Sequence, residues 1–247
     1  SAASLSQKNR ITGGLVDRNQ PLGFRFDGQH YTGFAGDTLA SALLANNVRL
    51  VGRSFKYHRP RGILTAGSEE PNALVTIGDG AYQDPNSRAT TAQLFEGMTA
   101  KSQTKMGLLS FDLMAVNDFL SPLLGAGFYY KTFMWPAAFW EKIYEPIIRK
   151  AAGLGSLSGL ADPDQYDKGY LHCDLLVIGS GPSGLMAALA PAKSGLQIIL
   201  ADEDFCLGGR LNAERQEIDG MESAAFAESC LAQLAAMDNV RIMSKTT

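Results

Sequence analysis

The sequence contains few cysteines, and they lie far apart. Among 247 residues there are three, Cys173, Cys206 and Cys230. Three cysteines are too few for a disulfide framework, and their spacing is not that of metal ligands. The sequence therefore predicts no metal site and a reducing, cytoplasmic compartment.

A strong net charge and a membrane-spanning run are also missing. The chain carries 22 Lys and Arg against 25 Asp and Glu, which argues against binding to the phosphate backbone of nucleic acid. Apolar residues gather at 107–150 and 175–192, but charges and prolines interrupt the first run and glycines interrupt the second. We therefore expect neither nucleic acid nor a membrane as a partner.

The charges that are present are unevenly distributed. Residues 1–62 carry nine Lys and Arg against three Asp, whereas residues 161–247 carry six against thirteen Asp and Glu. Such asymmetry predicts at least two modules with different roles. We place the boundaries at 1–105, 106–172 and 173–247.

The first part has the pattern of a small α+β module. Residues 22–26 and 29–34 alternate around the turn dipeptide Asp27-Gly28, which predicts a β-hairpin. A helix is expected from Asp37 to Asn46, followed by a strand at 73–77 and a further strand at 92–94. A hairpin, one crossing helix and returning strands predict a β-grasp-like domain.

The middle part is rich in bulky apolar residues. We expect short helices in it that dock on a neighbouring domain or subunit. The stretch 153–159, rich in glycine and serine, is followed by Asp162-Pro163-Asp164, and together they are expected to be a surface linker. The aromatic residues are Phe111, Phe119, Phe128, Tyr129, Tyr130, Phe133, Trp135, Phe139, Trp140 and Tyr144.

The last part carries a dinucleotide fingerprint. A strand at 174–178 is followed by GSGPSG at 179–184 and by a helix from 185 onward. Gly179 permits the tight turn, Gly181 lets a pyrophosphate approach the backbone, and Gly184 lets the helix lie close to the strand. The free amides at the start of the helix then face the phosphates.

Acidic residues follow at the spacing that the fingerprint requires. The next strand, 197–201, ends in Asp202, Glu203 and Asp204, about 20 residues after the glycine turn, where a carboxylate accepts ribose hydroxyls. Carboxylates here would repel a 2′-phosphate, so NADP is disfavoured. A second glycine turn, with Gly209 and Arg210, comes next; Arg210 is either a phosphate or adenine ligand or a surface residue paired with a nearby carboxylate.

A helix at 224–237 and a strand at 240–243 complete this pattern. Three strands and two crossovers form the first half of a Rossmann-type, doubly wound sheet. We therefore expect an α/β unit that is incomplete, so that the chain is the N-terminal part of something longer or is completed by another chain.

Two stretches resemble a known family. The runs GRSFKYHRPRG at 52–62 and AGSEEPNAL at 66–74, with the glycine turn near residue 180, resemble the α subunit of heterotetrameric sarcosine oxidases. The resemblance implies a ferredoxin-like first domain. A [2Fe–2S] cluster needs four thiolates, and residues 48–62 contain no cysteine, so we expect the β-grasp domain without an iron–sulfur cluster.

That loop is basic instead. One interpretation is a patch for anions or nucleic acid, and the other is a set of salt bridges to the acidic module or a partner subunit; the charge asymmetry favours the second. The basic residues are Arg49, Arg53, Lys56, Arg59 and Arg61.

The resemblance also implies an activity. In that family sarcosine is oxidised at FAD on the β subunit, electrons pass to FMN, hydrogen peroxide forms, and tetrahydrofolate receives the one-carbon unit. This chain would hold NAD and assemble with the β, γ and δ subunits and the rest of the α chain. The NAD site implied by the resemblance consists of Gly179, Gly181, Ser183, Gly184, Asp202, Glu203, Asp204, Gly209 and Arg210.

No residue has the context of an amine-oxidising catalyst, because His30, His58 and His172 are isolated in the sequence. Two alternatives remain open. In one, the chain is an FAD-binding catalytic subunit of another amine or opine dehydrogenase. In the other, it is an assembly scaffold whose nucleotide only stabilises the fold.

Overall fold

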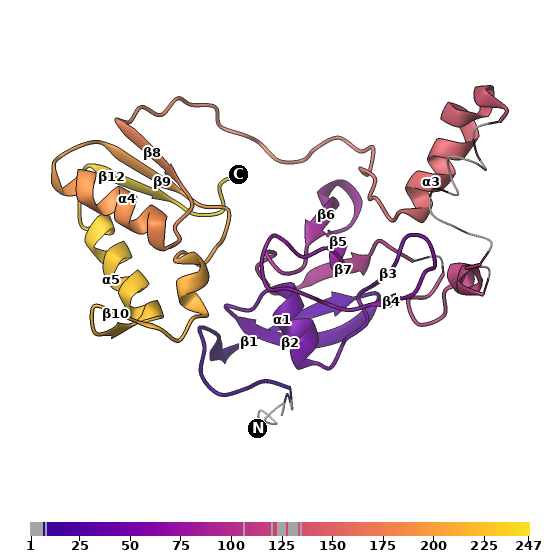
Figure 1. Ribbon diagram of the computed structural model, residues 1–247, viewed down its shortest axis with the longest axis horizontal. Coiled ribbons are helices and arrows are strands. Elements are labelled where there is room, and N and C mark those ends of the chain that lie inside the picture. The colour runs from indigo at the N-terminus through magenta and orange to yellow at the C-terminus, as the bar shows by residue number, and fades with distance from the viewer. Residues whose placement is uncertain are drawn as a thin grey trace. The chain divides into compact units, whose positions relative to one another are not determined.

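The computed structural model describes residues 7, 9–105, 107–119, 121–122, 127, 133 and 135–247. The chain divides into two compact units, residues 1–164 and 165–247 (Figure 1). Each unit has a hydrophobic core of its own. Of the aromatic residues noted above, Phe128, Tyr129 and Tyr130 lie outside the described residues.

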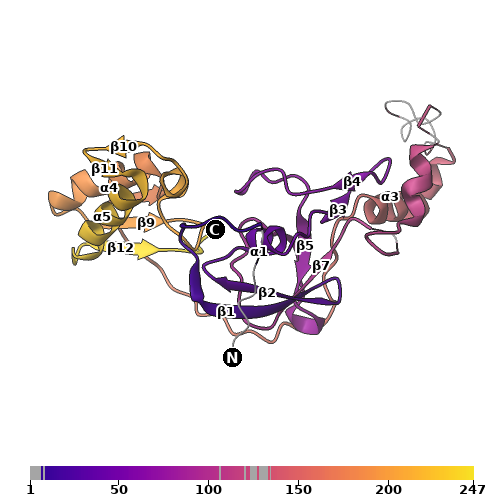
Figure 2. The ribbon, with the colours of Figure 1, turned by 90° about the horizontal axis from the view of Figure 1, so that it is seen from below.

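The first unit contains a mixed five-stranded sheet with strand order β2-β1-β7-β5-β6. Strands β1 and β2 are antiparallel, and β1 pairs with β7 in parallel. Helix α1 (Leu39–Ala45) packs on the sheet and buries Leu39 and Leu43 against Phe24 (Figure 2). The strands are β1 (Asp17–Phe26), β2 (Gln29–Ala35), β5 (Leu74–Ile77), β6 (Asp84–Arg88) and β7 (Met98–Ser102).

Local signals define the first hairpin and the helix start. Asp27 and Gly28 both have positive φ, 48° and 83°, as a two-residue hairpin turn of the primed type requires. Thr38 caps α1, since its side chain accepts a hydrogen bond from the Ser41 amide while the Ser41 side chain accepts one from the Thr38 amide. The predicted hairpin and the start of the predicted helix are confirmed.

The strand expected at residues 92–94 is reduced to an isolated antiparallel bridge between Gln93 and Thr38. This segment supports the beginning of α1 instead, because the Leu39 amide donates to the Ala92 carbonyl and the Leu94 amide donates to the Asp37 carbonyl. The returning strands are β6 and β7, whose polar sequences DPNSR and MTAKS have little of the β-branched and aromatic character that predicts strands.

The middle segment leaves the sheet after β7 and returns to it. It contains 3-10 turns at Leu113–Asp118 and Ala137–Phe139, a π-helical turn at Trp140–Tyr144 and helix α3 (Glu145–Ala151). These are the short helices that the sequence predicted. Residues 153–156 then contact β6 and the residues flanking β6 and β7: the Gln103 side chain donates to the Gly153 carbonyl at 3.0 Å, and the Gly155 amide donates to the Asn86 side chain at 2.9 Å.

The second unit contains a parallel three-stranded sheet with order β12-β9-β8. Helices α4 (Pro182–Lys193) and α5 (Ser223–Ala235) pack against it (Figure 1). Leu176 and Ile178 of β8 remain 52% and 81% exposed. The strands are β8 (Leu175–Ile178), β9 (Ile198–Ala201) and β12 (Val240–Met243), and a small hairpin of β10 (Glu217–Ile218) and β11 (Met221–Glu222) precedes α5.

This architecture confirms the mixed α/β class and the order of elements predicted for residues 173–247. The parallel strands place their carboxyl ends at one edge, where the 179–184 turn, the loop after β9 and the residues after β12 meet. Among the described residues, no helix has both the length and the apolar character needed to cross a membrane.

Candidate dinucleotide-binding site

The turn between β8 and α4 has the geometry that the fingerprint predicts. Gly179 has φ +97°, a conformation that side chains with a Cβ rarely adopt. Gly181 is the N-cap of α4, no side chain caps the helix there, and Pro182 occupies its first turn. The amides at the start of α4 are therefore not satisfied by a capping side chain and suit an anion.

Two glycines of the turn have opposite surroundings. A Cβ added to Gly184 would lie 1.8 Å from the Gly179 carbonyl oxygen, so α4 can approach β8 only because this residue lacks a side chain. A Cβ added to Gly181 would meet nothing within 4 Å. The structure thus separates a glycine needed for packing from one that leaves space beside the helix start.

Asp202 connects the turn to the end of β9. Its Oδ2 accepts hydrogen bonds from the Ser180 amide and from the Ser180 hydroxyl, both at 2.5 Å. Its Oδ1 accepts from the Asp204 amide at 2.9 Å. Ser180 is fully buried and Asp202 is 9% exposed. This carboxylate, predicted to face a ribose, is therefore occupied by bonds within the protein.

The two other predicted acids differ from it. Glu203 is exposed, and Asp204 is half-buried, with its amide bound to Asp202. The residues after β12 support the same loop: the Thr246 amide donates to the Asp202 carbonyl, and the Lys245 amide donates to the Asp204 carbonyl. The structure thus places the three acids together at the carboxyl edge of the sheet but in unequal environments.

The second glycine turn lies against the first. The Gly208 amide donates to the Ser180 hydroxyl oxygen at 2.9 Å. A Cβ added to Gly209 would lie 3.1 Å from the Gly181 Cα, and Gly209 has φ +54°. Glycines are therefore needed in both turns because the two backbones approach each other closely. The contact between Ser180 and Gly208 was not predicted from the spacing of residues in the sequence.

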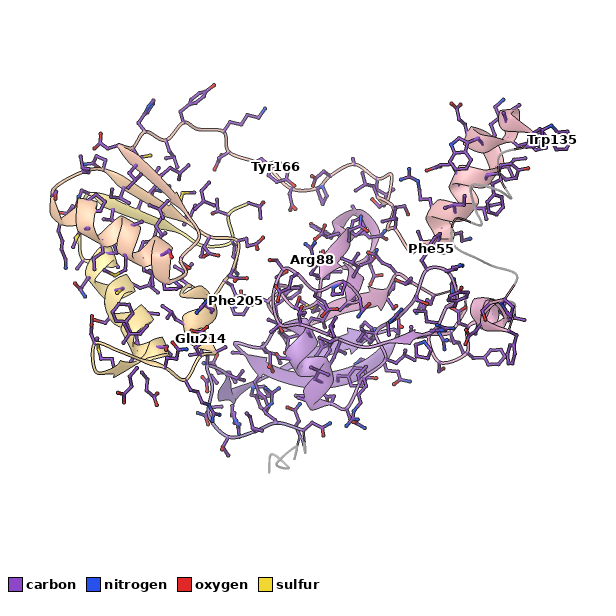
Figure 3. The ribbon with its side chains drawn as sticks, in the orientation of Figure 1. Phe55, Arg88, Trp135, Tyr166, Phe205 and Glu214 are labelled. Atoms are coloured by element: carbon purple, nitrogen blue, oxygen red, sulfur yellow. The ribbon has the colours of Figure 1, made fainter. Side chains whose placement is uncertain are left out.

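Arg210 lies in the 3-10 turn Gly209–Asn212 and is paired with an acid. Its Nε is 2.7 Å from Glu214 Oε1, and its side chain is 68% exposed. Figure 3 labels Glu214 and also Phe205, in the loop just before this turn. The pairing with a nearby carboxylate is one of the two alternatives that the sequence left open for Arg210.

The thiols near this site are poor nucleophiles. Burial, and secondarily the Asp204 carboxylate, raises the pKa of Cys206 above its ordinary value. Burial also raises the pKa of Cys230, which packs in the core of this unit. A protonated thiol is not reactive, so neither group supplies covalent chemistry at neutral pH.

The loop after α1 has a different construction. Strands β3 (Gly52–Arg53) and β4 (Pro60–Arg61) form a short hairpin. Arg53 is 8% exposed, and its guanidinium donates to the carbonyls of His58 and Leu109 at 2.8 and 2.9 Å. His58 Nδ1 lies 3.0 Å from Asp112 Oδ1, with both side chains buried.

The predicted role of this basic loop needs a correction. Arg53 is not available to an acidic partner, because backbone carbonyls of the same unit occupy its guanidinium. Arg59 is exposed and pairs with Asp118 at 2.7 Å, while its guanidinium and the Lys56 ammonium lie over the Tyr57 ring at 4.6 and 4.8 Å. The exposed Phe55 on this loop is labelled in Figure 3.

Family models match one region in each of the two units. Residues 19–105 match the model of a 2Fe-2S iron-sulfur cluster binding domain, and residues 174–240 match that of FAD dependent oxidoreductases. Residues 19–105 contain no cysteine, so this chain lacks the thiolates for the cluster. Among the described residues there is also no group of three or more His, Cys, Asp and Glu that could hold a metal ion.

Curated relatives extend over almost the whole chain. Sarcosine oxidase subunit alpha of Rhizobium meliloti (strain 1021) is 59% identical over 95% of this chain. The chain is similar to sarcosine oxidase subunit alpha. That of Corynebacterium sp. (strain U-96) is 34% identical over 96% of the chain. These matches confirm the predicted resemblance, and the chain spans 24% and 20% of the lengths of the two relatives.

A solved structure supports the fold. The crystal structure of L-proline dehydrogenase from P. horikoshii has a TM-score of 0.53 and covers 93% of this chain and 34% of its own. The sequence identity is 19%, so this similarity concerns the fold alone.

Proposed function

We propose that residues 173–247 bind the ADP portion of NAD, within the α subunit of a sarcosine-oxidising complex. The observation that carries the proposal is the turn after β8, where Gly181 leaves open space beside the amides at the start of α4. Backbone N–H groups and the positive end of the helix dipole favour a pyrophosphate there. The other residues proposed to contact the nucleotide are Gly179, Ser183, Gly209 and the exposed Glu203 after β9, while Gly184 and Asp202 support the site from within the protein.

The residues of this chain bind and orient, and none of them is assigned a catalytic role. Ser183 is exposed at the beginning of α4 and can donate its hydroxyl to a phosphate oxygen. Arg210 contributes to the phosphates only if it leaves Glu214. When bound, NAD would supply a nicotinamide ring capable of accepting hydride, but in this proposal it does not turn over.

The activity is proposed for the whole complex. Sarcosine, oxygen and tetrahydrofolate would give glycine, hydrogen peroxide and methylenetetrahydrofolate; the N-methyl carbon leaves sarcosine with two electrons going to oxygen. FAD, FMN and tetrahydrofolate would be held outside these 247 residues, and β, γ and δ subunits would be partners. The similarity to two sarcosine oxidase α subunits supports this proposal.

Exposed apolar side chains support the proposed partners. In residues 107–152, Phe119 and Trp135 are 87% and 83% exposed, and Trp135 is labelled in Figure 3. Large exposed apolar side chains such as these are available for a protein–protein contact. Near the two ends of this segment, the Leu109 carbonyl accepts a hydrogen bond from Arg53 and the Gly153 carbonyl accepts one from Gln103.

FAD is the second candidate ligand, because residues 174–240 match the model of FAD dependent oxidoreductases. FAD and NAD share the ADP portion, so the fingerprint accommodates both. The test is to release the ligand of the native protein with acid and to record its absorbance and mass. An adenine–nicotinamide product supports NAD; a yellow flavin without any adenine–nicotinamide product contradicts NAD and supports FAD.

The partners and the chemistry are tested on the native assembly. We expect intact-mass analysis to identify further subunits with FAD and FMN, and the assembly to consume oxygen with sarcosine. Removal of the nucleotide distinguishes a cofactor-dependent enzyme from a scaffold: assembly and full oxidation without nucleotide would favour the scaffold alternative.

A further inference from the structure

The carboxylate at the end of β9 is held by the backbone on both sides. The Asp202 amide donates to the Met243 carbonyl at 2.9 Å, and the Asp202 carbonyl accepts from the Thr246 amide at 2.9 Å. These bonds join the end of β9 to the residues around the end of β12. The backbone of Asp202 is therefore fixed on both sides, which limits the directions that its side chain can take.

Most of the acceptor capacity of Asp202 is already used. A carboxylate offers about four lone-pair directions. The Ser180 amide and hydroxyl take two of them on Oδ2, and the Asp204 amide takes one on Oδ1. Recognition of a ribose needs acceptors for the 2′- and 3′-hydroxyls together, and one remaining direction cannot accept both.

The same bonds link the two glycine turns. Ser180 follows Gly179 in the first turn, and its hydroxyl oxygen also accepts the Gly208 amide of the second turn at 2.9 Å. Asp202, Ser180 and Gly208 thus form a buried chain of hydrogen bonds beneath the two turns. Loss of one member would leave buried polar groups without partners and release the turns from each other.

Glu203 differs from Asp202 in its exposure to solvent. Glu203 directly follows Asp202, and its side chain is exposed. Asp204 is half-buried beside Cys206, whose pKa it helps to raise. Of the three acids after β9, Glu203 is the one whose carboxylate projects into solvent.

We propose that Asp202 is a positioning residue that fixes the spacing of the two glycine turns through Ser180, and that Glu203 is the acid that recognises the ribose and rejects a 2′-phosphate. The second half rests on the proposed function, because it presupposes a bound dinucleotide. The first half concerns the protein alone. The dinucleotide fingerprint would assign ribose recognition to Asp202, the first acid after β9; we assign it to the next residue, Glu203.

The binding test uses the native assembly freed of its nucleotide, with NAD and NADP as probes in calorimetry. Asp202→Asn and Ser180→Ala should each weaken binding of both nucleotides about tenfold and by a similar factor, because the turns that hold the shared pyrophosphate are displaced. Glu203→Gln should narrow the preference for NAD over NADP about tenfold. Ser194→Ala, at the exposed C-terminal end of α4 and away from both glycine turns, is the control for Ser180.

The assignment is overturned if the two variants show each other's expected effects. If Asp202→Asn changes the NAD-to-NADP preference and Glu203→Gln does not, Asp202 is the ribose ligand. Equal changes in the preference for both variants would also contradict the proposal, since it assigns discrimination to Glu203.

A second measurement separates the positioning role from the proposed function. Hydrogen exchange in the ligand-free assembly should accelerate in peptides covering both the 179–184 and 206–210 turns for Asp202→Asn and Ser180→Ala, and should not change for Glu203→Gln. If the wild-type assembly binds neither nucleotide, the proposed function fails, while the exchange result still decides the positioning role. Unchanged hydrogen exchange of both turns in Asp202→Asn would overturn the positioning role of Asp202.

Discussion

The loop around β3 and β4 and the turn between β8 and α4 each lie in a region that matches a family of cofactor-binding domains, but they differ in the space they leave for a ligand. Around β3 and β4 the protein fills its own space: a Cβ on Gly52 would lie 3.0 Å from the Asn72 carbonyl oxygen, and one on Gly62 would lie 2.8 Å from that of Arg49. At the turn after β8, a Cβ on Gly181 meets nothing within 4 Å.

The difference lies in where the polar groups point. Around β3 and β4, the Arg53 guanidinium and the His58–Asp112 contact are buried and directed at protein atoms. At the second turn, the polar chain from Asp202 through Ser180 lies beneath the backbone and leaves the amides of α4 facing outward. The loop around β3 and β4 is therefore stabilised by groups that fill it. The turn between β8 and α4 is stabilised from beneath, which leaves space for a ligand beside Gly181.

The largest expected effect tests the filled loop. Asp112→Ala removes the acid 3.0 Å from His58 Nδ1 and should lower the free energy of unfolding of the first unit by about 3 kcal/mol, because both groups are buried and the imidazole loses its acidic neighbour. Hydrogen exchange of peptides from β1 and β5 measures this. Asp118→Ala is the control: its pair with Arg59 is exposed, so the change should stay below about 1 kcal/mol. Equal effects would contradict a special role for the buried contact.

The next effect tests the packing glycine of the open turn. Gly184→Ala places a Cβ 1.8 Å from the Gly179 carbonyl oxygen, which forces α4 away from β8. We expect a loss of about 2–3 kcal/mol in the second unit, as is typical of overpacking. Exchange in peptides from β8 and β9 reports it, with those from β1 as an internal reference. A stable second unit would show that α4 can shift at little cost.

Gly181→Val tests the open space itself. Gly181 has φ −65°, which side chains tolerate, so the second unit should remain folded. Its side chain would occupy the proposed position of the pyrophosphate, and nucleotide affinity should fall at least about 100-fold, or about 2.7 kcal/mol. Calorimetry or the nucleotide content of the purified variant measures this. Full retention of nucleotide would place the ligand elsewhere.

The smallest effect concerns a second carboxylate in the first unit. Burial alone would raise the pKa of Glu70, but hydrogen bonds from the backbone of Thr65, Asn72 and Leu64 outweigh it, and the pKa lies below its ordinary value. The folded state therefore gains stability from ionised Glu70 above the ordinary glutamate pKa. This contribution is lost as the pH falls through the lowered value.

Glu70→Gln should accordingly destabilise the first unit by about 1–2 kcal/mol at neutral pH and flatten its acid dependence. Thermal unfolding between neutral pH and about pH 3 measures both. Glu69→Gln, at the exposed neighbouring residue, should leave the midpoint and its pH dependence unchanged. An unaltered acid dependence in Glu70→Gln would assign the acid sensitivity to another group.

Local patterns predicted the elements with strong signals. The Asp27-Gly28 turn, the capped start of α1 and the strand at 240–243 have the predicted places, because turn conformation, capping and apolar periodicity are properties of neighbouring residues. Strands β6 and β7 were missed because their polar sequences become strands through pairing with distant strands.

The candidate site was predictable in composition and less so in contacts. The glycine spacing identified the turn, and the distance to residues 202–204 identified the acids. Which of these acids faces solvent depends on Ser180, which is 22 residues away in sequence, and on Met243 and Thr246 after a further strand. Likewise, Arg53 was counted among surface cations, whereas residues 109 and 58 bury it.

By itself the sequence determined the class of each unit, the resemblance to sarcosine oxidase α subunits, the absence of cluster thiolates between residues 19 and 105, and the glycine turn, because these depend on residue types and short spacings. Only the tertiary structure decided which loop is filled and which stays open, and that Asp202 is bound beneath the turn while Glu203 is exposed. Burial and hydrogen-bond partners arise between segments distant in sequence, so no local pattern encodes them.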